Sequence, residues 1–391
     1  MVLFFRDAKY AKEKLMASEA ALFKLAPNYG NRTPGTYHME LFDTPIPASS
    51  VPLKGLKDET LVIHGIRLDA LDEQQKVSKY PLVTLHGYMN GALCYYRNLV
   101  GLTKYFPTVY SLDFLGWGLS SRPSFHPLDN SVQATENVFV ESLEAWRKAQ
   151  QIEKMVLAGH SMGGYLSVAY CEKYPERVER LILLSPVGVP EDANFATRKP
   201  SWAEWIVTRL FHLDVTPATI VRTLPESRGK GYVQRYMEQR YMEQRLPGVQ
   251  DPDERQALND YLYYNSISEP SGEYGLQRLL TPNAFPKEPI VHRIQDLEVD
   301  HITFLYGEVD WLDASGGLQV QKRSPLKNIS VYQVPKAGHL LMIDNWQAFD
   351  AAMGMAAGGP EQEGLKKLSV DDHDTDGAMA SHPPQVATTK V

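Results

Sequence analysis

A serine between two glycines is the feature of the sequence best suited to chemistry. Residues 159–163 read Gly-His-Ser-Met-Gly, a G-x-S-x-G pentapeptide that follows a short apolar run and precedes a stretch with helical character. This order is typical of a nucleophile elbow, a tight turn from a strand into a helix that holds the serine hydroxyl clear of the sheet. The pattern predicts that Ser161 is a catalytic nucleophile.

A serine hydroxyl is weak at neutral pH, so it needs a histidine base that is itself oriented by a buried acid. In doubly wound hydrolases the three residues follow in the order serine, acid, histidine. Of the eleven histidines, His339 is the one in the loop after the last strand signal, and we predict that it is the base. For the acid, which should follow the preceding strand, we favour Asp310; Asp313 is the rival, and Glu308 is less favoured because it lies closest to the strand end.

An oxyanion hole needs two backbone N–H groups that point to the developing negative charge. Met162 follows the nucleophile and is expected to supply one of them. The second is expected from the glycine-containing loop 85–91, with the N–H of Tyr88 as the candidate. We interpret His86 as a structural loop residue and Asp113 as a brace of the glycine turn that follows it.

The elements that must position these residues are visible as an alternation of short apolar runs with helical stretches, and this alternation predicts a mostly parallel, doubly wound α/β sheet. An antiparallel pair is expected before it, at residues 37–44 and 59–68, and a helix with one apolar stripe at 131–150. The apolar runs are residues 81–86, 108–113, 154–158, 178–184, 301–306 and 329–334.

The alternation is interrupted in the second half of the chain, where a segment rich in charge, proline and tyrosine predicts an inserted helical cap at residues 190–297. The core then consists of residues 35–189 and 298–357. Within the cap, a capping box at 201–204 opens a helix that carries Trp202 and Trp205 on one side. This side is expected to pack on the core or to line an acyl pocket.

The two ends of the chain differ from the core. Residues 1–34 form a helical segment whose apolar spacing predicts packing on the domain, with contact to a membrane surface as the alternative. Residues 358–391 lack hydrophobic periodicity, and we expect them to be disordered.

Composition limits the classes of function. The net charge of −7 does not provide the basic surface of a nucleic-acid-binding protein, and two cysteines exclude a disulfide framework. No apolar run reaches the length of a membrane span, and no secretory signal is evident. We therefore expect a cytoplasmic protein, with contact to a membrane surface as an alternative.

Taken together, these motifs resemble those of the α/β-hydrolase superfamily. The resemblance rests on His86-Gly87, Asp113 with Gly116 and Gly118, Gly159 to Gly164, Asp310-Trp311 and Gly338-His339. It implies an α/β-hydrolase fold, and it covers about residues 35–356.

Shorter motifs resemble a eukaryotic subfamily of lipid metabolism, which includes N-acyl-phospholipid lipases, fungal cardiolipin deacylases, lysophosphatidic acid acyltransferase-like proteins and a lipase coactivator of lipid droplets. These motifs are Thr216-Pro217, Val221-Arg222, Ser271-Gly272-Glu273, residues 306–311, and His339 with Asp344. The coactivator carries asparagine at the nucleophile position, so Ser161 favours an enzyme. Relatives often show Gly-Pro-x-Gly after the cap arginine, whereas this chain has Pro225 to Gly229.

The resemblance implies a serine hydrolase that cleaves an acyl ester of a phospholipid or lysophospholipid, with no cofactor and no metal. The alternatives are acyl transfer to lysophosphatidic acid at the same site, and a non-catalytic coactivator. The resemblance also implies possible peripheral attachment to a lipid droplet, the endoplasmic reticulum or a mitochondrial membrane. Arg222 could bind a lipid phosphate through its planar fork, or form a structural ion pair. The spacing from His339 to Asp344 resembles an acyltransferase signature, but we interpret Asp344 as the first residue of a capping box that opens the final helix.

Overall fold

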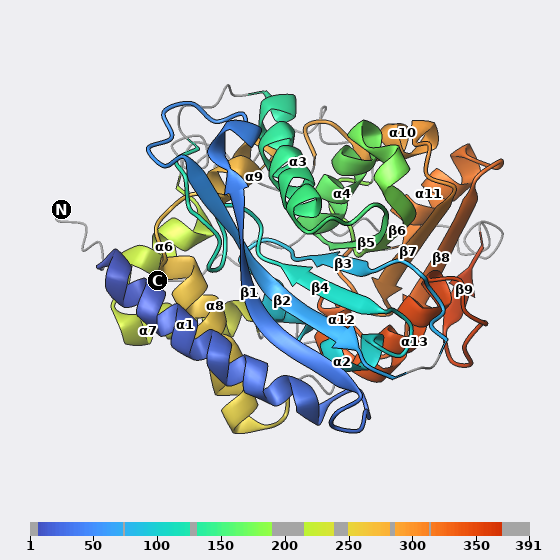
Figure 1. Ribbon diagram of the computed structural model, residues 1–391, viewed down its shortest axis with the longest axis horizontal. Helices are drawn as coiled ribbons and strands as arrows, with labels where there is room; N and C mark the ends of the chain where they lie inside the picture. The colour runs from blue at the N-terminus through green and yellow to red at the C-terminus, as the bar shows by residue number, and fades with distance from the viewer. Residues whose placement is uncertain are drawn as a thin grey trace, which may run out of the picture.

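The computed structural model describes residues 7–72, 75–125, 131–189, 215–237, 249–281, 286–312 and 314–369. Its centre is one nine-stranded sheet in the order β1-β2-β4-β3-β5-β6-β7-β8-β9 (Figure 1). The strands are β1 Tyr37–Pro47, β2 Thr60–Ala70, β3 Leu82–Leu85, β4 Thr108–Leu112, β5 Met155–His160, β6 Val178–Leu184, β7 His301–Gly307, β8 Asn328–Val334 and β9 Lys366–Leu368.

The sheet has the expected α/β character. Strands β4, β3, β5, β6, β7 and β8 pair in parallel, whereas β1 and β2 form an antiparallel pair and β2 joins β4 antiparallel. Each of the predicted strands is present, with ends that differ by a few residues. The prediction of a mostly parallel sheet preceded by an antiparallel pair is confirmed.

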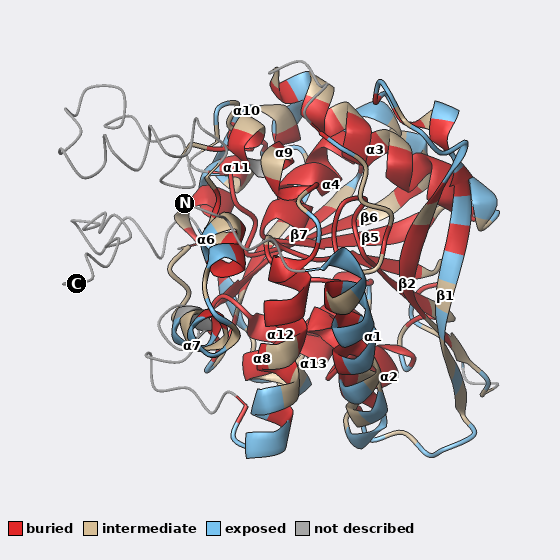
Figure 2. Ribbon diagram, turned by 90° about the vertical axis from the view of Figure 1, so that its left-hand side faces the viewer, coloured by how far each residue is buried: buried red, intermediate tan, exposed pale blue. Residues whose placement is uncertain are grey.

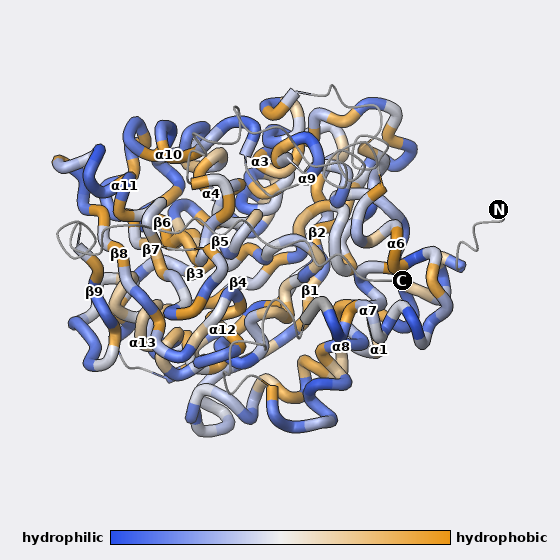
Figure 3. Tube along the Cα trace, turned by 180° about the vertical axis from the view of Figure 1, so that it is seen from behind, coloured by the Kyte–Doolittle hydropathy of each residue, from blue (hydrophilic) through white to orange (hydrophobic). Residues whose placement is uncertain are grey.

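Helices cover both faces of the sheet, which is why its central strands are apolar on both sides. In Figure 1, α3, α4, α10 and α11 lie above the sheet, and α2, α12 and α13 lie below it. Successive residues of β5 therefore enter different cores: Leu157 packs in the first hydrophobic cluster, and Val156 and Ala158 in the second. Figure 2 shows these strands as continuously buried, and Figure 3 shows hydrophobic residues concentrated along them.

The described helices are α1 Ala8–Leu25, α2 Leu99–Leu102, α3 Val132–Ala149, α4 Met162–Lys173, α6 Pro217–Thr223, α7 Glu226–Met237, α8 Pro252–Ile267, α9 Glu273–Leu279, α10 Ile290–Arg293, α11 Ser315–Arg323, α12 Leu341–Asp344 and α13 Trp346–Ala356. Helix α3 is the helix predicted at 131–150; its N-cap is Ser131, which accepts a hydrogen bond from Ala134 N–H. In the part of the chain that the structure describes, no helix is long and apolar enough to cross a membrane.

Helix α1 packs on the protein, as its apolar spacing predicts. Ala11, Leu15 and Leu22 are buried, and the helix lies along α8 (Figures 1 and 2). Helices α6 to α10 are inserted between β6 and β7, two neighbouring strands of the sheet. Residues 190–214, 238–248 and 282–285 of this insertion, including Trp202 and Trp205, lie outside the described residues.

The expectation of disorder from residue 358 onward is wrong for its first part. Lys366 to Leu368 form β9, which pairs antiparallel with β8. Leu368 is buried in the first hydrophobic cluster. A short strand here satisfies backbone groups that would otherwise remain open at the edge of the sheet, a tertiary effect without a periodic signal in sequence. Residues 370–391 lie outside the described residues.

Candidate active site

Ser161 occupies a tight turn between β5, which ends at His160, and α4, which begins at Met162. Its backbone has φ 54° and ψ −115°, a conformation that is unfavourable for a residue other than glycine. Backbone hydrogen bonds hold this conformation: Ser161 N–H donates to Leu184 O at 2.9 Å, and Ser161 O accepts from Gly164 N–H at 3.0 Å. The turn therefore has the geometry of a nucleophile elbow.

The two glycines of the pentapeptide are required by close backbone approach. A Cβ atom on Gly159 would lie 2.3 Å from the carbonyl oxygen of Gly163. One on Gly163 would lie 2.7 Å from the carbonyl oxygens of Leu85 and His86. Helix α4 can thus leave the strand directly behind the serine only if both positions lack a side chain.

The structure brings Ser161, His339 and Asp310 together as a hydrogen-bonded triad. His339 Nε2 lies 3.2 Å from Ser161 Oγ, and His339 Nδ1 lies 3.0 Å from Asp310 Oδ1. The side chain of Asp310 is fully buried, and that of His339 is 4% exposed. Asp310 Oδ1 also accepts a hydrogen bond from Leu312 N–H at 3.0 Å, which orients the carboxylate. With Asp310 accepting from Nδ1–H, Nε2 of a neutral His339 can take a proton from the serine.

The other candidates for the acid are placed differently. Glu308 is exposed, and its carboxylate accepts a hydrogen bond from Lys336 N–H at 2.8 Å. Asp313 lies outside the described residues. Of the acids that the structure describes in this loop, Asp310 is the one hydrogen-bonded to His339.

The two candidates for the oxyanion hole belong to segments that lie beside the serine. Met162 opens α4 immediately after Ser161. The loop that carries Tyr88 passes beside the nucleophile, because a Cβ atom on Gly87 would lie 3.0 Å from Ser161 Cβ. The ring of Tyr88 packs edge-on against Trp117, with ring centroids 5.2 Å apart. This position is compatible with the predicted role of the Tyr88 N–H.

His86 and Asp113 support these loops, as interpreted from the sequence. His86 Nδ1–H donates to Gly87 O at 2.7 Å, and its Nε2 accepts from Phe114 N–H at 3.1 Å. Asp113 accepts hydrogen bonds from Ala92 N–H at 2.7 Å and from Leu119 N–H at 2.8 Å. Both side chains thereby connect the loops that follow β3 and β4.

The contacts by which two residues hold the His339 loop were not predicted from the sequence. His160 Nε2–H donates to the carbonyl oxygen of His339 at 2.8 Å, and burial lowers the pKa of His160 well below its usual value. Asp344 Oδ2 accepts a hydrogen bond from Gly338 N–H at 2.8 Å. Nothing in the spacing of these residues indicates such contacts, which depend on how the loop folds back on the sheet.

The interpretation of Asp344 as a helix cap is wrong. Asp344 is the last residue of α12, and the N-cap of α13 is Asn345, whose side chain accepts from Ala348 N–H at 3.3 Å. Asparagine and aspartate are nearly equal as N-caps, so the sequence could not separate the two neighbours. The buried backbone N–H of Gly338 decides the outcome by using the Asp344 carboxylate.

Asn265, near the end of α8, attaches the insertion to the loops around the site and was also missed. Its Nδ2 donates to Asn90 O at 2.8 Å, and its Oδ1 accepts from Gly118 N–H at 3.0 Å. Arg122 Nη2 donates to the same Oδ1 at 2.8 Å. One side chain therefore joins the insertion to the loops after β3 and β4.

Arg222 is buried and engaged within the insertion. Its Nη2 lies 2.5 Å from Glu273 Oε1, and its Nε donates to Ser268 O at 2.9 Å. The Glu273 carboxylate also accepts from Ser271 N–H at 2.9 Å. These contacts are those of the structural ion pair that the sequence offered as the alternative to phosphate binding.

Among the described residues, Glu19, His64 and Asp113 form a buried group whose potential metal-ligand atoms lie within 4.8 Å of one another. His64 Nε2 lies 3.1 Å from Glu19, and Nδ1 lies 2.6 Å from Asp43. Burial by itself lowers the pKa of His64, but the surrounding carboxylates raise it to about 9. An imidazolium thus supplies the positive charge that these carboxylates need, and it anchors α1 to β2.

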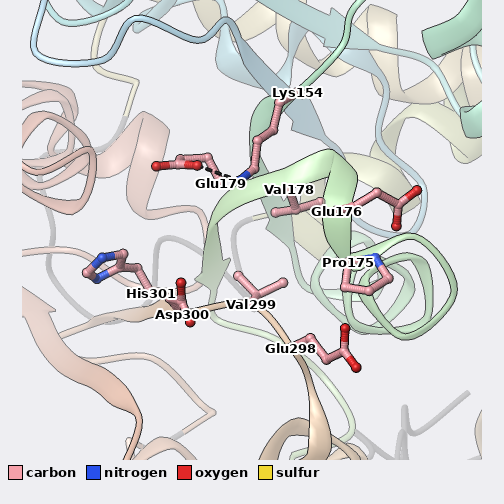
Figure 4. Close-up of a pocket in the computed structure, with 9 residues that line it drawn as sticks. All are labelled: Lys154, Pro175, Glu176, Val178, Glu179, Glu298, Val299, Asp300 and His301. Atoms are coloured by element: carbon pink, nitrogen blue, oxygen red, sulfur yellow. Dashed lines mark ion pairs between the residues drawn. The ribbon is translucent and has the colours of Figure 1, made fainter.

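A surface pocket lies at the amino ends of three central strands, where β5, β6 and β7 begin (Figure 4). Its acidic lining includes Glu176, Glu298 and Asp300. Lys154 and Glu179 also line it and form an ion pair, with 2.7 Å between Nζ and Oε2. Ser161 follows the carboxyl end of β5. This pocket is therefore remote from the serine.

A mostly parallel sheet with a serine elbow after β5 and helices on both faces defines the α/β-hydrolase fold. The family profile described as the alpha/beta hydrolase fold matches residues 80–345. The chain therefore belongs to the α/β-hydrolase family.

Three similar proteins have names that describe lipid chemistry. A probable 1-acylglycerol-3-phosphate O-acyltransferase of Oryza sativa subsp. japonica is 34% identical over 73% of this chain and 69% of that protein. The 1-acylglycerol-3-phosphate O-acyltransferase ABHD5 of Mus musculus is 32% identical over 77% of this chain and 84% of that protein. A (lyso)-N-acylphosphatidylethanolamine lipase of Mus musculus is 31% identical over 71% of this chain and 79% of that protein.

Solved structures agree with the fold. A membrane phospholipase A described as a bacterial virulence factor has a TM-score of 0.56 and 18% identity, covering 92% of this chain and 94% of that one. Carboxylesterase CesB from Bacillus subtilis has a TM-score of 0.54 and 17% identity, covering 89% and 100%. At these identities the similarity concerns the fold alone.

Proposed function

We propose that the protein is a serine hydrolase that cleaves an acyl ester of a phospholipid or lysophospholipid through an acyl-enzyme. The observation that carries this proposal is the hydrogen-bonded triad. Ser161 Oγ lies 3.2 Å from His339 Nε2, and His339 Nδ1 lies 3.0 Å from Asp310 Oδ1. The names of the lipase and acyltransferase relatives support a lipid ester as the substrate class.

In the first half of the proposed reaction, Ser161 Oγ attacks the ester carbonyl carbon while His339 Nε2 takes the serine proton. The N–H groups of Met162 and Tyr88 stabilise the negative oxygen of the tetrahedral intermediate. The bond from carbon to the alcohol oxygen then breaks, and His339 returns the proton to the leaving alcohol. Asp310 keeps His339 in the productive tautomer and stabilises its charged form.

In the second half, water attacks the acyl-enzyme and loses a proton to His339. The Ser161 Oγ–acyl bond then breaks, His339 returns the proton to Ser161 Oγ, and the fatty acid leaves. A lysolipid hydroxyl could attack the same acyl carbon and give a new ester in place of the acid. The acyltransferase relatives, at 34% and 32% identity, favour this transfer as the second candidate function. We propose that the protein meets its lipid substrate and a lysolipid acceptor at a membrane or lipid-droplet surface, which it approaches from the aqueous side.

The test is labelling by a fluorophosphonate, which reacts with an activated serine, combined with turnover of a phospholipid and of a neutral short-chain ester. Wild-type protein should label, and Ser161→Ala should abolish labelling and lower turnover about 10⁴-fold or more while the protein stays folded. Adding lysophosphatidic acid measures the share of acyl transfer. A wild-type protein that does not label would favour the non-catalytic coactivator instead.

A further inference from the structure

Helix α8 of the insertion is joined at its first turn to the segment that follows His339. Glu254, on α8, receives two hydrogen bonds from Arg97, from Nε at 2.9 Å and from Nη2 at 2.8 Å. The remaining nitrogen of the same fork, Nη1, donates to the carbonyl oxygen of Ile343 at 2.7 Å. One guanidinium therefore connects the insertion with α12.

This connection is buried and has a fixed geometry. The side chains of Arg97 and Glu254 are 7% and 6% exposed. Tyr29 OH donates to the Glu254 carboxylate at 2.5 Å, Tyr96 OH donates to it as well, and the guanidinium lies 5.0 Å from the centre of the Tyr29 ring. Burial opposes ionisation of Glu254, but the hydrogen bonds from Arg97 and the tyrosines hold its pKa below the usual value.

Ile343 leads directly to the His339 loop, because the next residue is Asp344. Asp344 Oδ2 accepts the N–H of Gly338, the residue before His339, at 2.8 Å. Burial raises the pKa of Asp344 to about 7; the Gly338 N–H and the Arg97 charge act against this rise, and the Asp310 charge adds to it. Position and charge at Asp344 thus depend on Arg97.

We propose that Arg97, Glu254 and Asp344 are positioning residues that hold His339 in line with Ser161. This alignment then depends on the position of helix α8 relative to α12. The inference rests on the proposed role of His339 as the base. A buried ion pair is seldom the most stable solution for a core position, whereas a bidentate fork fixes direction as well as distance. Here the fork fixes the distance between α8 and α12.

Two consequences follow for the reaction. Loss of the fork lets α12 and the His339 loop shift, and a displacement of about 1 Å at a reacting group costs on the order of 100-fold in rate. Protonation of Asp344 weakens its hydrogen bond to Gly338 N–H, because the bond loses its charge assistance. The rate then depends on the ionisation of Asp344.

The first experiment compares Glu254→Gln with a matched control, Glu144→Gln. Glu144 is also buried, receives two hydrogen bonds of 2.8 Å from Arg147 and one of 2.8 Å from Tyr170 OH, and belongs to α3 on the other face of the sheet. Both variants should lower the melting temperature. Glu254→Gln alone should lower kcat for a short-chain ester and the fluorophosphonate labelling rate, each by about 10-fold to 100-fold, with KM nearly unchanged.

Arg97→Lys provides a second variant if Glu254→Gln does not fold, because lysine keeps the charge and loses the fork. It should lower kcat in the same way. In the second experiment, log(kcat/KM) is measured against pH. The wild-type plot should contain an inflection near pH 7, where Asp344 takes up a proton, and the Asp344→Asn plot should lack this inflection.

Equal labelling rates in the Glu254→Gln and Glu144→Gln variants, or pH profiles of the same shape in wild type and Asp344→Asn, would overturn the inference. Such results leave the proposed function intact as long as wild-type Ser161 labels. If wild-type Ser161 does not label, the proposed function itself fails. The two failures are therefore distinguishable.

Discussion

Alanine at position 159 tests whether the close approach of β5 and α4 sets the position of the nucleophile. A Cβ atom there would lie 2.3 Å from Gly163 O and 2.4 Å from both Gly163 C and Ser167 Oγ, whereas ordinary contacts begin near 3.4 Å. Two of the three atoms belong to the backbone and cannot rotate away. The helix must therefore move by about 1 Å, the difference between these distances.

The magnitude follows from this shift. Overpacking of a core typically costs 1–3 kcal/mol, and the rigid neighbours place Gly159→Ala at about 3 kcal/mol of unfolding free energy. A displacement of about 1 Å at Ser161 should also lower turnover on the order of 100-fold. Urea unfolding measures the first effect, and hydrolysis of a short-chain ester with the folded protein measures the second.

Gly231→Ala is the matched control. Gly231 lies in α7, and a Cβ atom there meets nothing within 4 Å. Alanine should stabilise this helix by about 0.5–1 kcal/mol and leave turnover unchanged. Wild-type stability and turnover in Gly159→Ala would refute the argument, because the backbone would then have room for a side chain behind Ser161.

Three further predictions concern individual side chains. Asp310→Asn should lower turnover about 10⁴-fold by favouring the wrong tautomer of His339, whereas Asp313→Asn should stay near wild type; the opposite ranking, measured by ester hydrolysis, would move the acid to Asp313. Arg222→Lys should change KM for a phospholipid and for a neutral ester by the same factor, because Arg222 is paired with Glu273; a change for the phospholipid alone would indicate phosphate binding. The pKa of His64 is raised from 6.5 to about 9, so the stabilisation by its charged form is complete below pH 6.5 and is lost as the pH rises through 9. Urea unfolding should show a loss of at most about 3 kcal/mol across this range in wild type, and no such loss in His64→Gln.

Local patterns in the sequence were sufficient for the strands and for the elbow. The central strands are buried on both faces, so they read as apolar runs and could be located within a few residues. The elbow is a contact between residues a few positions apart, and its requirement for small residues at 159 and 163 is therefore visible in the sequence. The order of serine, acid and histidine then restricted the candidates for the triad.

The exact partner atoms depended on contacts between distant parts of the chain. Ser161 and His339 are 178 residues apart, and Arg97 and Glu254 are 157 residues apart. Such pairs are decided by the order of the strands in the sheet and by the packing of the loops at their carboxyl ends. For this reason the bonds made by His160 and Asp344, and the link through Asn265, were missed.

The sequence by itself determined the parallel α/β sheet, the glycine-bounded turn at Ser161 and the identity of the chemical groups, because these depend on periodicity and on neighbours along the chain. Only the tertiary structure decided that Asp310 faces His339 while Glu308 is exposed, and that Arg222 is paired within the insertion. It also decided that Lys366 to Leu368 close the edge of the sheet. The physical reason is that burial and hydrogen-bond partners of a polar group depend on surfaces that come together only when the whole chain folds.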